Sequence, residues 1–163
     1  MSMVDESVPP SVQEQIRAAV RLREAGDVEA AYALLAPLWP KVEHGDAFDR
    51  LFFAHSFADV QASPDEELRW DLIALEALRG VTERRAADQG VHGGVAGLRP
   101  SLHLNLAYIY ARVGEMDPAQ DHYRLALKDV DALDHESYGQ GIRQALMDFA
   151  ARYPASERSE PRR

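Results

Sequence analysis

Hydrophobic residues recur every three or four positions along most of the chain. The first clear series is Val12, Ile16, Ala19 and Val20, and later segments repeat this spacing. Such spacing places apolar residues on one face of an α-helix, whereas the alternation typical of β-strands persists nowhere in the sequence. The pattern therefore predicts an all-α protein.

Capping residues and helix breakers divide the chain into elements. Ser11 is followed three residues later by Glu14, the spacing of a capping box, and Gly114 stands where one helix should end and the next begin. Pro37 and Pro40 should bend or end the second helix early, because each removes a backbone donor. The expected helices cover 11–25, 27–43, 47–62, 64–88, 100–113, 117–131 and 136–153.

The linkers between these helices are short, so neighbouring helices should pack as antiparallel hairpins. The exception is 86–99, which contains four glycines and is predicted to be an inserted loop. We expect one helical domain over 11–153, flanked by disordered ends at 1–10 and 154–163.

Composition narrows the class of protein. Twenty-seven acidic and eighteen basic residues give 163 residues a formal net charge of −9, which disfavours binding to nucleic acid. The chain has no cysteine, so it can form neither disulfides nor thiolate metal sites, and a reducing, cytoplasmic location is expected. No apolar run approaches the roughly 20 residues that span a bilayer, so no membrane partner is expected.

The hairpin at 100–133 resembles the tetratricopeptide repeat (TPR), a helix-turn-helix of about 34 residues with small residues and aromatics at fixed places. The matching residues are Asn105, Leu106, Ala107, Tyr110, Gly114, Ala119, Tyr123, Ala126 and Leu127. The segment 12–45 matches more loosely. The segment 51–84 departs from the signature, since Asp65 replaces the turn glycine and Trp70 replaces a small residue. The resemblance implies an α-α superhelix of three hairpins, capped by a helix at 136–153.

The resemblance also implies a function. TPR arrays bind peptides or partner proteins in a concave groove formed by the first helix of each pair. The groove positions carried over to this chain are Gln13, Arg17, Arg23, Phe52, His55, Asp59, Ser101, Asn105, Tyr108 and Arg112. Amide and hydroxyl groups there can bond a main chain, aromatics can anchor apolar side chains, and the arginines suit an acidic segment. We expect a non-catalytic protein-binding module that needs no cofactor.

Two other functions remain open. His55 and Asp59 are four residues apart on one helix, a spacing found in metal sites, and His103 could join them to form a metal-dependent or small-molecule-handling enzyme. Alternatively, the chain could be a self-assembling structural module. The apolar stripe on the helix at 64–88 is wide enough to be either enclosed by two layers or part of a homodimer interface.

Overall fold

The structure is a computed structural model, and it describes residues 9–155. All regular structure in this range is helical, which confirms the all-α prediction. The α-helices are α1 (Val12–Glu24), α2 (Val28–Leu35), α3 (Trp39–Val42), α4 (Ala47–Ala58), α5 (Pro64–Leu78), α6 (Glu83–Asp88), α7 (Gly94–Arg112), α8 (Met116–Lys128) and α9 (Ser137–Arg152). Short 3₁₀ turns cover Ala36–Leu38 and Val130–Ala132. Among these helices, none has the length and apolar character needed to cross a membrane.

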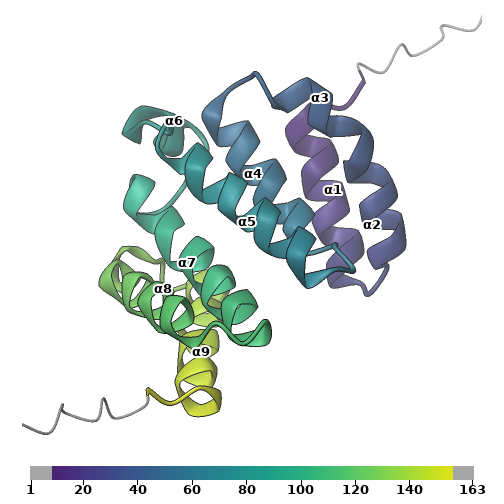
Figure 1. The fold of residues 1–163 in the computed structure, drawn as a ribbon. Coiled ribbons are helices and arrows are strands. Elements are labelled where there is room, and N and C mark those ends of the chain that lie inside the picture. The colour runs from purple at the N-terminus through teal and green to yellow at the C-terminus, as the bar shows by residue number, and fades with distance from the viewer. Residues whose placement is uncertain (1–8, 156–163) are drawn as a thin grey trace, which may run out of the picture.

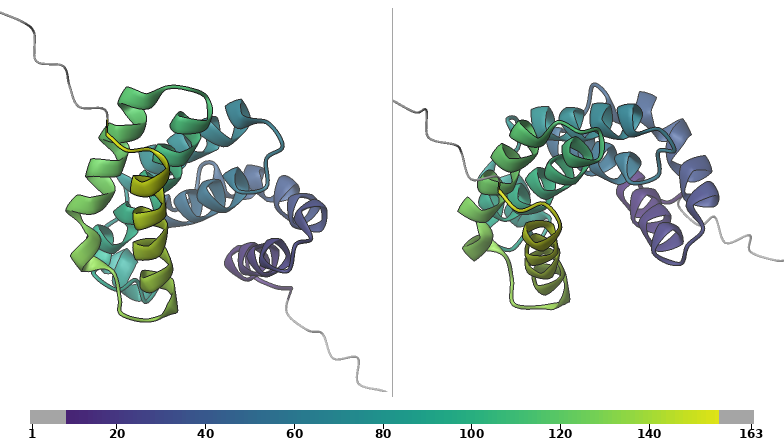
Figure 2. Two further views of the ribbon diagram at one scale, coloured as in Figure 1. Left: turned by 90° about the horizontal axis from the view of Figure 1, so that it is seen from below. Right: turned by 60° about the horizontal axis from the view of Figure 1, so that its bottom comes forward.

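The helices pack mainly as antiparallel pairs of sequence neighbours. α1 packs on α2, α4 on α5, and α7 on α8 (Figure 1). Successive pairs are joined by contacts of α1 with α4 and of α5 with α7, while α9 packs against α7. The result is an arc with α1 near one end and α9 near the other (Figure 2).

Local sequence signals explain where several helices begin and end. Ser11 Oγ accepts a hydrogen bond from the Glu14 backbone N–H at 3.2 Å, and the Glu14 carboxylate accepts one from the Ser11 N–H at 2.7 Å, so the predicted capping box is present. Gly26 and Gly114 have φ angles of 89° and 87°, which favour glycine at the turns after α1 and α7. The second predicted helix ends early at Leu35, continues as a 3₁₀ turn and then forms α3, as expected from its two prolines.

The predicted helix at 64–88 is wrong as a single element. α5 ends at Leu78, and α6 begins only at Glu83. Thr82 starts α6, because its hydroxyl accepts a hydrogen bond from the Arg85 backbone N–H at 3.1 Å. The break falls at Gly80 and Val81, just before this cap.

The predicted loop at 86–99 is also wrong over most of its length. α7 begins at Gly94 and contains Pro100, so only 89–93 connects α6 to α7. Gly97 lies inside α7, where the first turns of the helix pack tightly against the connecting segment 89–93. A Cβ atom at this position would lie 1.8 Å from the His92 carbonyl oxygen. Glycine here permits close packing of a helix, although glycine-rich sequence is usually typical of a loop.

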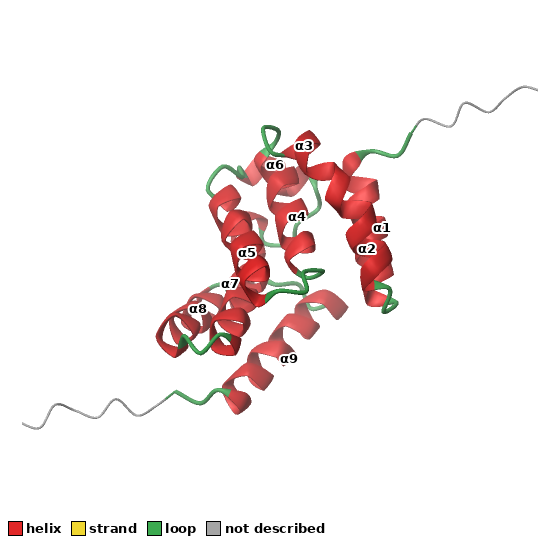
Figure 3. Ribbon diagram, turned by 45° about the vertical axis from the view of Figure 1, so that its right-hand side comes forward, coloured by secondary structure: helices red, strands yellow, loops and turns green. Residues whose placement is uncertain are grey.

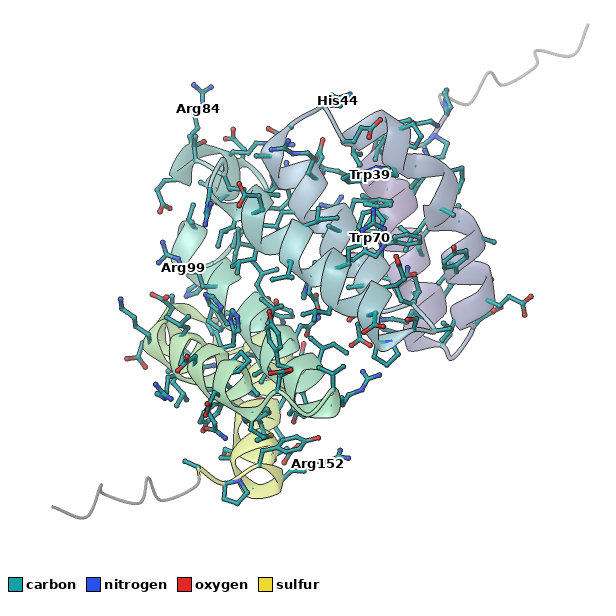
Figure 4. All side chains as sticks on the ribbon, viewed as in Figure 1. Trp39, His44, Trp70, Arg84, Arg99 and Arg152 are labelled. Atoms are coloured by element: carbon teal, nitrogen blue, oxygen red, sulfur yellow. The ribbon has the colours of Figure 1, made fainter. Side chains whose placement is uncertain are left out.

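Aromatic side chains fill the core around α4 and α5. Trp70 stands where the TPR signature has a small residue, and it packs edge-on against Trp39 and Phe57 with ring centroids 4.9 Å apart in both pairs. Figure 4 shows the two tryptophans close together. A second cluster joins α7, α8 and α9, where Phe149 stacks on Tyr123 at 5.0 Å. The bulky Trp70 is therefore accommodated within a cluster of aromatic rings.

Gly97→Ala is expected to lower the free energy of unfolding by about 2 kcal/mol, because the added methyl group would clash with the His92 carbonyl. Gly141→Ala in α9 is the matched control, since a Cβ there meets nothing within 4 Å. Alanine at that exposed helical position should stabilise the protein by about 0.5–1 kcal/mol. Urea unfolding followed by circular dichroism measures both effects, and equal values would contradict the close approach at Gly97.

Candidate functional site

A cavity of about 410 Å³ lies between α1, α4, α7 and the start of α9. In Figure 3 the N-terminal end of α9 is the end nearest to α4 and α1. The segment at 89–92 and the chain at 133–134 complete the wall. Three of these helices, α1, α4 and α7, are the first members of their pairs.

The cavity has an apolar interior with polar groups among its walls. Its apolar side chains come mainly from α4 and α7 and include Phe48, Leu51, Phe52, Leu98 and Leu102. Its polar side chains are Arg23, Glu24, His55, Ser56, Asp59, Gln89, His92, Ser101, Asp134 and Tyr138. This combination is typical of sites that bury an apolar side chain and orient it by a few hydrogen bonds.

A polar network includes three side chains of the cavity wall, Arg23, His55 and Asp59, and two residues behind it, Asp71 and Asn105. Arg23 forms an ion pair with Asp59. The Asn105 amide donates to Asp59 Oδ1 at 3.2 Å and to Asp71 Oδ1 at 3.4 Å. His55 Nδ1 lies 3.8 Å from Asp71 Oδ1. The network thus connects four helices: α1, α4, α5 and α7.

Asp71 is the most buried member of this network, with 1% of its surface exposed. Its Oδ2 atom has no hydrogen-bond partner among the residues that the structure describes. Burial raises the pKa of the Asp71 carboxyl, although His55 and Asn105 oppose this shift. For His55, burial disfavours the charged form, but the nearby carboxylates of Asp71 and Asp59 outweigh it and raise the pKa. A protonated His55 therefore compensates the buried carboxylate.

The structure brings five of the predicted groove residues to the cavity: Arg23, Phe52, His55, Asp59 and Ser101. Asn105 lies directly behind them in the polar network. Several of these residues already have partners within the chain, as Arg23 does in Asp59 and Ser101 in the Leu98 carbonyl.

The other four predicted residues do not line the cavity. Gln13 donates to Asp49 at 2.7 Å, and the Arg17 guanidinium lies over the Phe52 ring, 5.9 Å from its centroid. Arg112 is bound by Glu67 at 2.7 and 3.0 Å.

Tyr108 requires a correction. It was expected to be an apolar anchor in the groove, but it is half-buried and packs against α9. Its hydroxyl donates to the Ala145 carbonyl at 3.0 Å, and its ring packs edge-on against Phe149. The sequence did not show that the helix expected as an end cap would cover α7.

His103 does not join His55 and Asp59. Its Nδ1 lies 2.9 Å from His122 Nδ1, and the His122 ring stacks on Tyr110. Between residues 9 and 155, no group of three or more histidine, aspartate or glutamate side chains is arranged to hold a metal ion. The geometry that would support the metal-enzyme alternative is not formed.

Sequence reasoning missed Asp71 and Tyr138. Asp71 shares a helical face with Ala74 and Leu78, which are buried, so an acidic residue within an apolar stripe was the available signal. Tyr138 comes to the cavity because α9 folds back onto α7, and no pattern in the sequence specified that arrangement.

Comparison of the chain with protein-family models, with curated proteins and with solved structures finds no match.

The pKa of His55 implies a pH dependence. Because this pKa is raised in the folded protein, the stabilisation by charged His55 is complete below about pH 6.5 and is lost as the pH rises through the folded-state pKa. The free energy of unfolding should therefore fall as the pH rises above about 6.5. Asp71→Asn should remove most of this decrease, since Asp71 is the main group that raises the pKa.

Chemical denaturation at several pH values would test this. Asp65→Asn is the control, because Asp65 is an exposed acid on the same helix and lies outside the polar network. It should retain the wild-type profile. If Asp71→Asn kept the wild-type dependence of unfolding free energy on pH, Asp71 would not be the group that raises the pKa of His55.

The pair of His103 and His122 has the opposite pH dependence. Burial and the nearby His122 lower the pKa of His103 to about 4, so the neutral pair stabilises the fold above about pH 6.5 and this stabilisation is lost as the pH falls through 4. Lowering the pH from 7 to 4.5 should reduce the free energy of unfolding by about 2 kcal/mol through this pair. His103→Gln should reduce that loss, whereas His44→Gln at an exposed position should not. If the wild type, His103→Gln and His44→Gln lost the same stability at low pH, the His103–His122 pair would not be the source of the acid sensitivity.

Proposed function

We propose that this protein is a non-catalytic binding module that holds a peptide segment of a partner protein in the cavity between α1, α4, α7 and α9. The observation that carries the proposal is the cavity itself. It is apolar inside, has hydrogen-bonding side chains among its walls, and is formed by helices from three successive pairs.

Its dimensions favour side chains of a peptide as the occupant. A volume of about 410 Å³ accommodates one or two apolar side chains, with Phe52 and Leu98 as contacts. Tyr138, Gln89 and His92 can hydrogen-bond to the main chain of such a segment. The proposed TPR-like superhelix supports the same function, because stacked helix pairs expose an extended inner surface.

The polar groups at the cavity favour binding over catalysis. The Ser101 hydroxyl donates to the Leu98 carbonyl at 3.3 Å instead of contacting a histidine base. His55 and Asp59 are engaged in the polar network, which holds α1, α4, α5 and α7 together. We therefore assign these residues a positioning role.

The arginines do not provide a reason to favour an acidic segment. Arg23 is paired with Asp59 and Arg112 with Glu67, so two of the three charges that suggested an acidic ligand are compensated by the chain itself. We expect apolar contacts to supply most of the affinity.

The test is selection of a randomised peptide library on the purified protein, followed by binding measurements with Phe52→Ala. Removing the Phe52 ring should weaken binding of the selected peptides at least tenfold, which corresponds to about 1.4 kcal/mol of binding free energy. Tyr32→Ala is the matched control, because Tyr32 is an exposed aromatic residue on α2 and does not line the cavity. It should change affinity less than twofold.

Two results would contradict the proposal. One is the absence of any enriched peptide. The other is enrichment of peptides whose binding Tyr32→Ala and Phe52→Ala weaken equally. Circular dichroism of both variants establishes that the fold is retained.

A further inference from the structure

A second hollow, of about 730 Å³, follows the outer face of α5 and is here called the α5 groove. Its apolar side chains are Trp39, Leu68, Leu72, Ile73 and Ala77, and its charged side chains are Glu43, Arg50, Asp65, Arg69 and Glu76. None of these residues lines the cavity described above. The two surfaces can therefore act independently.

The apolar stripe of α5 is only partly enclosed. Trp70, Ala74 and Leu78 are buried in the core. Leu72 lies on another side of the helix and is 40% exposed. The α5 groove therefore leaves apolar surface of α5 open to solvent.

Charged residues flank Leu72 in a particular order. On its N-terminal side Glu66 is paired with Arg69 at 3.1 Å, and on its C-terminal side Glu76 is paired with Arg79 at 2.9 Å. All four side chains are exposed. Along the helix the order is acid, base, leucine, acid, base.

This order is complementary to itself when one helix is reversed. In an antiparallel pair of α5 helices whose two-fold axis passes between Leu72 and Ile73, Arg69 of each copy faces Glu76 of the other. In a parallel pair, like charges would face each other. The intrahelical ion pairs would then extend into two four-membered networks, one on each side of an apolar centre.

We propose that the α5 groove is a dimer interface, in which a second copy of this chain packs its α5 antiparallel across a two-fold axis near Leu72. The exposed face of α5 fills the groove of the opposite copy. The peptide-binding cavity is lined by other residues, so dimerisation leaves it open.

A charge swap tests the pairing. Sedimentation equilibrium of the full chain should show a monomer–dimer equilibrium. Arg69→Glu places like charges opposite each other and should weaken dimerisation about tenfold or more. The double variant Arg69→Glu/Glu76→Arg restores opposite charges between copies and should return the dissociation constant to within about threefold of the wild type. High salt should weaken the wild-type dimer.

Cross-linking provides a second readout that does not depend on charge. The chain has no cysteine, so Leu72→Cys introduces its only thiol. Mild oxidation should convert this variant rapidly to a disulfide-linked dimer. Leu125→Cys is the matched control, because Leu125 has a similar exposure of 42% and lies on α8. It should cross-link slowly.

Three results would overturn the proposal. The first is a monomer at every concentration reached. The second is a dimer whose affinity the double charge swap does not restore after loss in Arg69→Glu. The third is equal cross-linking through positions 72 and 125. None of these outcomes bears on peptide binding in the cavity, so the two proposals fail separately.

Discussion

Close packing of helix pairs through alanine is the constraint on which the rest of this structure depends. Ala107, Ala119 and Ala126 are fully buried between α7 and α8, and Ala54 and Ala74 have the same role between α4 and α5. Small side chains let two helices approach closely, and larger residues then fill the space beside them. Each pair alone would leave an apolar face exposed, so the next pair must cover it. The arc and its inner cavity follow from this repeated stacking.

The polar network is the exception within this apolar packing. Asp71 is an acidic residue in the buried face of α5, and burial of a carboxylate is costly unless hydrogen bonds and opposite charge compensate it. His55 and Asn105 provide that compensation from α4 and α7. Because their partners lie on different helix pairs, these contacts are satisfied together only when the pairs are correctly stacked. The network therefore links the geometry of the cavity wall to the packing of the whole arc.

The two proposed surfaces differ in how many parts of the chain form them. The inner cavity depends on several helices that are distant in sequence, and its walls include the connection at 89–92 and the first turn of α9. The outer face of α5 belongs mainly to one helix, whose order of charges can be read directly. An arrangement with partner binding inside the arc and self-association outside it would let two bound segments be held by one dimer, which raises the effective concentration of each for its neighbour.

The sequence alone determined the all-α class and most helix boundaries, because helical periodicity and capping act over a few residues. The prediction of a loop at 86–99 was wrong, because a glycine can either form a loop or allow close packing inside a helix. The sequence does not distinguish these two uses. Tertiary structure alone decided that α9 packs against Tyr108, that His103 pairs with His122, and that Asp71 joins the network. These contacts join residues 19–37 positions apart, and their formation depends on how whole helices stack, which local patterns do not encode.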